Sequence, residues 1–136
     1  MPKKINSRKK GAAGERELVH KLREMFNLDA STTYRGCQHS GGPDSPDVKS
    51  EEMDPIWHIE CKRVNRLNIW NAMLQSIRDC GGDSVPVVIH RADRQEWLLT
   101  LRLDDIIVLA SKISSFVDNK NQAMKGDNNE TTCNKE

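Results

Sequence analysis

Apolar side chains recur along this chain with two different periods, and the period predicts each element. A spacing of three to four residues predicts a helix from about Ala13 to Phe26, with an apolar stripe that includes Leu18, Leu22 and Met25. The same spacing predicts a second helix over residues 67–80, which two glycines end. A closing helix is expected over residues 103–117. Three helices are therefore predicted.

Five further segments have the alternation or the composition of strands. They are residues 32–38, a stretch that starts at Asp47 and ends before Met53, and residues 56–63, 85–91 and 96–101. A turn around Met53 to Pro55 separates the second strand from the third, so a hairpin is their simplest pairing. The predicted order is helix, three strands, helix, two strands and helix, which is an α/β domain.

The two ends of the chain differ from its middle in composition. At 136 residues and a net charge of +1, the chain has the size of one domain. We expect residues 1–12 to form a basic flexible arm, residues 13–117 the folded domain, and residues 118–136 a disordered polar tail. The arm suits phosphate backbones, although a solubilising terminus has the same composition. Its cations are Lys3, Lys4, Arg8, Lys9 and Lys10.

The cysteines do not have the spacing of a zinc or redox motif. Cys37, Cys61, Cys80 and Cys133 stand far apart, and we interpret Cys37 and its neighbour His39 as loop residues. Neither a signal peptide nor an apolar run of about 18 residues is present in this sequence. We therefore expect a soluble, cytoplasmic protein in a reducing compartment.

The strand over residues 56–63 carries an unusual pair of charges. Glu60 and Lys62 share one face with Ile56 and His58, while the opposite face is apolar. Burying two such charges without polar ligands would cost several kcal/mol for each ion. The pair therefore either faces water or serves a site.

Two more acids are placed to join that pair. Asp47 begins the preceding strand, and the apolar stripe of the first helix, extended backwards, reaches Glu15. Glu17 instead falls on the polar face of the same helix. Asp44, in the loop before Asp47, is a weaker candidate because it lies outside the strand.

These residues resemble a known signature. Pro46-Asp47 followed by Glu60-x-Lys62 resembles the motif of the PD-(D/E)XK nucleases, and "KGAAGERELVHKL", "SPDV", "HIECKR" and Gln75 are similar, in order and spacing, to the archaeal-type and phage Holliday junction resolvases. The resemblance covers about residues 8–110. It implies a restriction-endonuclease-like core, with a central mixed five-stranded sheet flanked by helices.

The resemblance also implies a role for each motif residue. Asp47, Glu60 and the main-chain carbonyl of Cys61 would bind Mg²⁺, for which Mn²⁺ would substitute, and Glu15 would reach the metal directly or through water. Lys62 would hold or deprotonate the attacking water, and Gln75 would enter from the second helix. DNA contacts are expected at Lys3, Lys4, Arg8, Lys9, Lys10, Arg16, Arg35 and Arg63.

The function implied is a metal-dependent endonuclease that resolves four-way DNA junctions. Because one such domain is too small to span two strands of a junction, we expect a homodimer. Two alternatives are a PD-(D/E)XK nuclease with another preference, such as a restriction-like, flap or repair enzyme, and a DNA-binding module that does not cut. The complete acid set argues against the last.

Overall fold

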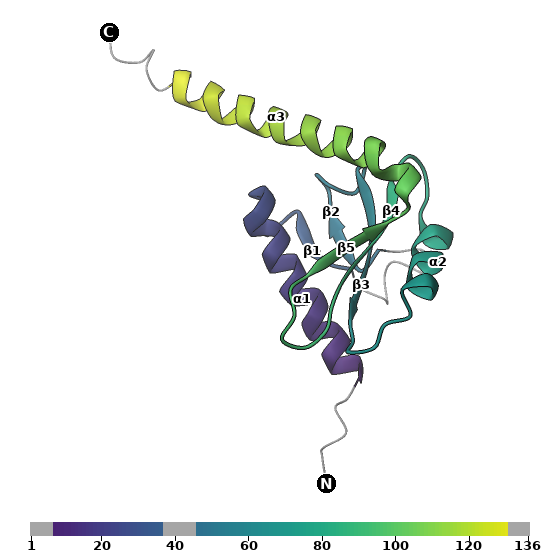
Figure 1. Cartoon of the computed structure of the whole chain (residues 1–136). Coiled ribbons are helices and arrows are strands. Elements are labelled where there is room, and N and C mark those ends of the chain that lie inside the picture. Colours follow the sequence, from purple (N-terminus) through teal and green to yellow (C-terminus); the bar gives the residue numbers. More distant parts are fainter. Residues whose placement is uncertain (1–6, 37–45, 131–136) are drawn as a thin grey trace.

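The computed structural model describes residues 7–36 and 46–130, and within them the elements follow the predicted order (Figure 1). The chain is mixed α/β. The helices are α1 (Ser7–Phe26), α2 (Ile69–Asp79) and α3 (Ile106–Glu130), with a short 3-10 helix, η1 (Leu103–Asp105), before the last. The strands are β1 (Thr33–Arg35), β2 (Val48–Ser50), β3 (Trp57–Arg63), β4 (Val85–Arg91) and β5 (Leu98–Leu101).

The strands form two sheets rather than the single five-stranded sheet that we expected. β3 pairs with β4 in parallel and β4 pairs with β5 antiparallel, while β1 and β2 form a separate antiparallel pair. The predicted hairpin of β2 with β3 was wrong, because β2 pairs with β1 and a turn starts directly after Ser50. The two sheets still approach each other where the Asp47 amide donates to the Ile59 carbonyl, at 3.1 Å.

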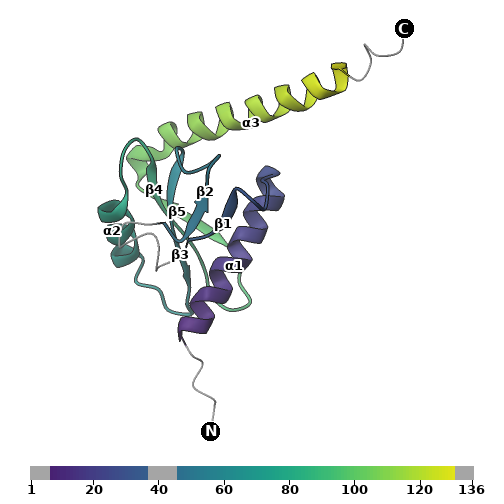
Figure 2. The same cartoon turned by 180° about the vertical axis from the view of Figure 1, so that it is seen from behind.

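Helices cover both faces of the three-stranded sheet (Figures 1 and 2). One face packs with α1 and the start of α3 in the main core, which contains Leu18, Ile59 and Val87. The other face packs against α2, where Val88 meets Met73 in a smaller apolar cluster. Because β4 is buried on both faces, its sequence is a continuous apolar run rather than an alternating one.

A buried serine fixes α2 above the sheet. The Ser76 hydroxyl lies 3.2 Å from the His58 carbonyl of β3 and 3.0 Å from the Val87 carbonyl of β4, so it can donate to either. At the other end of the helix, the Asn68 side chain caps α2 by accepting from the Asn71 amide. The orientation of α2, and therefore of the neighbouring Gln75, is fixed at both ends.

Two helices are longer than the sequence predicts. Residues 7–12, which we placed in a flexible arm, are the first turns of α1, and α3 continues through residues that we placed in a disordered tail, as far as Glu130. Only its first part packs on the core, through Leu109 among others, and the remainder projects from the domain (Figures 1 and 2). Met25, predicted to lie in the α1 core stripe, is 61% exposed.

A glycine allows α1 to lie directly against the end of β3. A Cβ atom at Gly14 would come within 2.8 Å of the Arg63 Cβ, whereas a Cβ at Gly11 would meet no atom within 4 Å. Contacts as short as the first do not occur between real side chains, so α1 or β3 would have to move. The close approach at Gly14 therefore sets the position of the next residue, Glu15.

This difference gives a matched pair of variants for a stability measurement. Gly11→Ala should raise the free energy of unfolding by about 0.5–1 kcal/mol, because alanine is the better residue within a helix. Gly14→Ala gains the same helix propensity but must displace Arg63, so we expect a net loss of stability of about 1–3 kcal/mol. Urea unfolding measures both, and equal stabilisation by the two substitutions would contradict the close packing of α1 on β3.

Candidate active site

A buried carboxylate on β3 forms the centre of the candidate site. Glu60 is 4% exposed, and its Oε1 lies 3.0 Å from the Nζ of Lys62, whose side chain is 31% exposed. The Oε1 of Gln75 on α2 lies 3.5 Å from the same Nζ. The alternation of β3 therefore brings Glu60 and Lys62 together on the α2 face of the sheet, within reach of Gln75.

Asp47 is held beside β3 by main-chain hydrogen bonds. Its amide donates to the Ile59 carbonyl at 3.1 Å, and its carbonyl accepts from the Gly36 amide at 2.8 Å. Its carboxylate Oδ2 accepts from the Cys61 amide at 2.8 Å. The Asp47 carboxylate is thus fixed next to the residue that lies between Glu60 and Lys62.

Glu15 approaches the same region from α1. Its side chain is 13% exposed, and its Oε2 accepts a hydrogen bond from the Nε of Arg35 on β1. Arg35, which we expected to contact DNA, therefore forms an ion pair with one of the acids of the site.

The acids influence one another electrostatically. The pKa of Asp47 is raised to about 7, first because the carboxyl is buried and then because Glu60 lies close to it. The Cys61 amide opposes this rise, Glu15 adds to it, and Lys62 acts against it. Glu15, Asp47 and Glu60 thus bring three carboxyl groups close to the two cations Lys62 and Arg35, and a carboxyl whose pKa is shifted by burial and by neighbouring acids is frequent at functional sites.

The thiol of Cys61 is not suited to nucleophilic chemistry. Its pKa is raised, first by burial and then by the negative charges of Asp47, Glu15 and Glu60. A thiol in such surroundings stays protonated at neutral pH, and the thiolate is the reactive form. The candidate chemistry of the site therefore rests on its carboxylates and on Lys62.

The described residues contain no set of three or more His, Cys, Asp or Glu side chains close enough to hold a metal ion. What the site offers instead is two carboxylates, those of Asp47 and Glu60, beside the main chain of Cys61. Mg²⁺ commonly takes one or two carboxylates and fills its other positions with water and phosphate oxygens. The donor types therefore fit Mg²⁺, and the neighbouring acids that raise the pKa of Asp47 would favour a bound cation.

The basic residues predicted to bind DNA differ in their surroundings. Arg16 is exposed on α1, whereas Arg63 lies near Glu17 and Asp93, at 3.6 and 3.8 Å. Lys10 forms an ion pair with Asp93 at 3.0 Å. Arg8 and Lys9 lie in the first turns of α1. Several predicted positions fall outside the described residues: Lys3, Lys4, Cys37, His39, Asp44 and Cys133.

We predicted that Glu17 lies on the solvated face of α1, and this prediction was wrong. Its Oε1 lies 2.6 Å from the Nη2 of Arg91 on β4, and its Oε2 lies 3.6 Å from the Nη1 of Arg63 on β3. The prediction failed because the polar spacing of α1 does not show that two strand-end arginines approach it from another element. Glu24, which is 71% exposed, is the α1 acid on the solvated face.

Sequence reasoning also missed residues that support the site from outside it. Gly36 lies so close to the residues before β2 that a Cβ atom there would overlap the Pro46 carbonyl oxygen, so a side chain would displace the segment that holds Asp47. Arg91 was missed too. The signal for it was available, because "HIECKR" and "VVIHR" both end in arginine, and parallel pairing in register places Arg63 beside Arg91.

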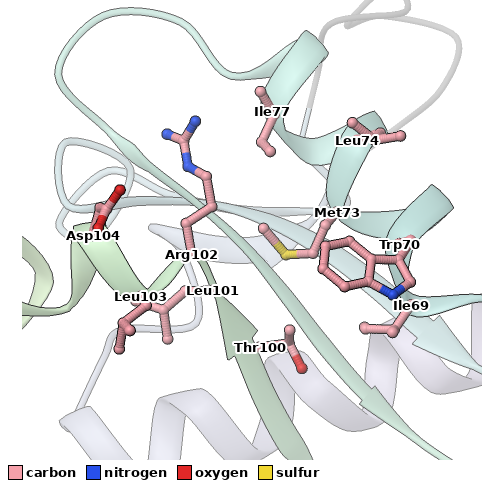
Figure 3. Close-up of a pocket in the computed structure, with 10 residues that line it drawn as sticks. All are labelled: Ile69, Trp70, Met73, Leu74, Ile77, Thr100, Leu101, Arg102, Leu103 and Asp104. Atoms are coloured by element: carbon pink, nitrogen blue, oxygen red, sulfur yellow. The ribbon is translucent and has the colours of Figure 1, made fainter.

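A separate apolar groove lies between α2 and the end of β5. It has a volume of about 450 Å³, and Figure 3 shows Met73 of α2 pointing into it, opposite Leu101 and Leu103. Trp70 and Leu103 at its rim are 79% and 82% exposed. Apolar side chains this exposed and this close together are typical of a contact surface rather than of a catalytic pocket.

Comparisons of the chain with protein-family models, with curated proteins and with solved structures found no match. Among the helices of the described residues, none combines the length and the apolar character that a membrane crossing requires.

The pKa of Asp47 predicts how stability depends on pH without metal. Because the folded-state pKa of about 7 exceeds the ordinary value of 3.8, the folded protein retains a proton that the unfolded chain loses between these values. Stability should therefore fall as pH rises from about 4 to 7 and then level off. Asp47→Asn should remove this fall and unfold less readily than the parent at about pH 8, by at most about 4 kcal/mol.

Urea unfolding in chelator at about pH 5 and about pH 8 measures this difference. The exposed Asp83 provides the control, since Asp83→Asn should leave the pH dependence of the parent unchanged. An Asp47→Asn protein that loses stability with rising pH as steeply as the parent would contradict the arrangement of acids described above.

Proposed function

We propose that this chain is a metal-dependent DNA endonuclease of the PD-(D/E)XK type, and more narrowly a Holliday junction resolvase. The observation that carries the proposal is the convergence of four side chains on the second half of β3: Glu15 from α1, Asp47 from the residue before β2, and Glu60 and Lys62 from β3 itself. The sequence motif alone did not require this, since Glu-x-Lys is a common pattern on the solvated faces of sheets.

The finer fold assignment belongs to the same proposal. A helix, a strand pair, a strand, a crossover helix and an antiparallel edge strand suit a restriction-endonuclease-like core, in which β2 would lie beside β3. The hydrogen bonds that Asp47 exchanges with Ile59 and Cys61 support this neighbourhood of β2 and β3, although the two strands do not share a ladder.

Each residue of the site has a definite task in phosphodiester hydrolysis. Mg²⁺, when bound, would supply a Lewis acid and lower the pKa of a water molecule. Asp47 and Glu60 would provide its carboxylate ligands, and the main-chain carbonyl of Cys61 a further oxygen. Lys62, held between Glu60 and Gln75, would orient the attacking water and stabilise negative charge on the phosphate in the transition state. Glu15 would bind a water molecule of the metal ion.

A homodimer would give such an enzyme two sites for two strands. The apolar groove and its exposed rim support this part of the proposal. β5, whose last residues line the groove, is also the edge strand of its sheet. A surface that one chain presents once can pair with its own copy around a twofold axis, which is the usual symmetry of small oligomers. We therefore propose that two copies meet through Trp70, Leu74 and Leu103.

Conservative substitution of the two metal-binding acids tests the nuclease proposal. Glu60→Gln and Asp47→Asn should each reduce Mg²⁺-dependent cleavage of a four-way junction by about a thousandfold or more, because metal binding and water activation are lost. Junction binding in chelator should persist, since neither acid contributes positive charge. Single-turnover cleavage and fluorescence anisotropy measure the two properties, and an active Glu60→Gln protein would refute the site.

The substrate in the same assay separates the possible activities. Paired symmetric nicks that a ligase can seal indicate resolution, whereas equal cleavage of duplex or single strands indicates another nuclease, and binding without cleavage indicates a non-catalytic module. Glu15→Gln and Lys62→Ala should lower the rate, while Glu24→Gln should cut like the parent because Glu24 lies on the solvated face of α1. Equal losses at Glu15 and Glu24 would remove Glu15 from the site.

The dimer proposal has its own test. Trp70→Asp should convert a dimer into a monomer in solution, because a charge would be buried at the centre of the contact. Met124→Asp places the same charge on an exposed residue in the outer part of α3, away from the groove and from β5, and should leave the dimer intact. Light scattering after gel filtration measures the mass, and a monomeric parent, or dissociation by both substitutions, would contradict this interface.

A further inference from the structure

A second group of charges lies beyond the candidate active site, at the end of β3. It surrounds a hollow of about 710 Å³ between the start of α1, the ends of β3 and β4, and the turn that follows β4. The side chains that line this hollow are Lys9, Lys10, Arg63, Arg91, Asp93 and Arg94. Five of these six residues are cationic.

Three of the cations are held in place by acids. Lys10 pairs with Asp93 at 3.0 Å, and Arg91 pairs with Glu17 at 2.6 Å, while Arg63 lies within 4 Å of both acids. Hydrogen bonds from Lys10 and then from Asn65 hold the pKa of Asp93 below its ordinary value, so this acid is ionised at neutral pH. Five positive charges therefore face two negative ones, and the hollow keeps a positive surplus.

The surplus is carried by Lys9 and Arg94. Within residues 7–36 and 46–130, neither side chain has an ion-pair partner. Arg94 has a φ of +62°, at the third position of a turn that the hydrogen bond from the Gln95 amide to the Ala92 carbonyl closes at 3.2 Å. Glycine or asparagine is the usual residue in that conformation. An arginine there costs stability and makes no ion pair, which is a reason to look for a role in binding.

Distance along the strand relates this hollow to the candidate active site. Arg63 follows Lys62 directly and lies three residues beyond Glu60. At about 3.3 Å of rise for each strand residue, the hollow starts about 10 Å from the carboxylate of the site. Successive phosphates of one DNA strand advance about 3.4 Å along the helix axis, but they are farther apart than this because the backbone winds around the axis, so the distance corresponds to about one to three nucleotides.

We propose that this hollow binds one backbone phosphate of the DNA, about one to three nucleotides from the bond that is cut, with Lys9 and Arg94 as its direct contacts. Lys10, Arg63 and Arg91 supply the surrounding positive potential. The inference rests on the proposed nuclease function, because that function supplies the DNA, but it concerns binding rather than chemistry. It also assigns a task to the turn after β4, which contributes nothing to the acid cluster.

Binding of a labelled four-way junction in chelator, where no cleavage occurs, tests this site. Arg94→Gln removes the charge and leaves a shorter, uncharged polar side chain. Loss of one phosphate contact in each protomer should lower the slope of log affinity against log salt by about one for each protomer bound, and lower the affinity about tenfold or more at about 0.1 M salt. Arg78→Gln removes one charge from the exposed end of α2 and should change neither quantity.

Neutral phosphates in the DNA locate the contact. In a series of junctions, each with a single methylphosphonate, one substitution within about one to three nucleotides of the cut should weaken binding of the parent but not weaken Arg94→Gln further. Neutral phosphates elsewhere should affect both proteins equally. Full affinity in Arg94→Gln, or additive losses at every methylphosphonate position, would overturn the proposal.

Arg94→Gly separates binding from folding. Glycine adopts the positive φ without strain, so this protein should be at least as stable as the parent in urea, yet it should bind the junction as weakly as Arg94→Gln does. Weak binding accompanied by lost stability would overturn the assignment of Arg94 as a contact. The nuclease proposal is judged separately, since normal Mg²⁺-dependent cleavage by the parent together with unchanged binding by both variants would refute the phosphate site alone.

Discussion

The ion pair between Glu60 and Lys62 is the interaction on which the rest of the arrangement depends. A carboxylate that is 4% exposed is costly to bury, and removing its partner ammonium would leave an uncompensated charge inside the protein. The pair also fixes the face of β3 that carries polar groups, because the alternation of the strand leaves the opposite face for the main core. The placement of α2, with Gln75 near the ammonium, follows from that choice.

The division of the strands into two sheets is the second determinant of the site. The main-chain amide of Asp47 donates to the Ile59 carbonyl of β3. The next amide along the same edge of β3, that of Cys61, instead donates to the Asp47 carboxylate. A side chain thus takes the place that a strand carbonyl would hold in a continuous ladder. The gap in the sheet and the position of the acid have the same cause, and Gly36 permits the close approach of β1 that supports both.

Local patterns predicted the elements well and their pairing less well. The apolar run of β4 and the glycine stop after α2 define elements whose bounds depend on short stretches of sequence. The partner of β2 depends on a turn and on the Thr33–Ser50 hydroxyl contact, which no periodicity reveals. The full lengths of α1 and α3 were missed because their outer turns lack an apolar stripe. The acids that gather near β3 were predictable, but the ion pairs of Glu17 with Arg91 and of Glu15 with Arg35 join elements distant in sequence.

The ion pair of Lys10 with Asp93 joins residues 83 positions apart, the first turns of α1 and the turn after β4. Long basic side chains normally sample many rotamers, and fixing each one on a ligand costs up to about 2 kcal/mol of side-chain entropy. Here Lys10, Arg63 and Arg91 are already restrained by carboxylates before anything binds. Much of the ordering cost is thus met during folding. The residual cost of ordering on ligand binding is concentrated in Lys9 and Arg94, which form no ion pair with any residue that the structure describes.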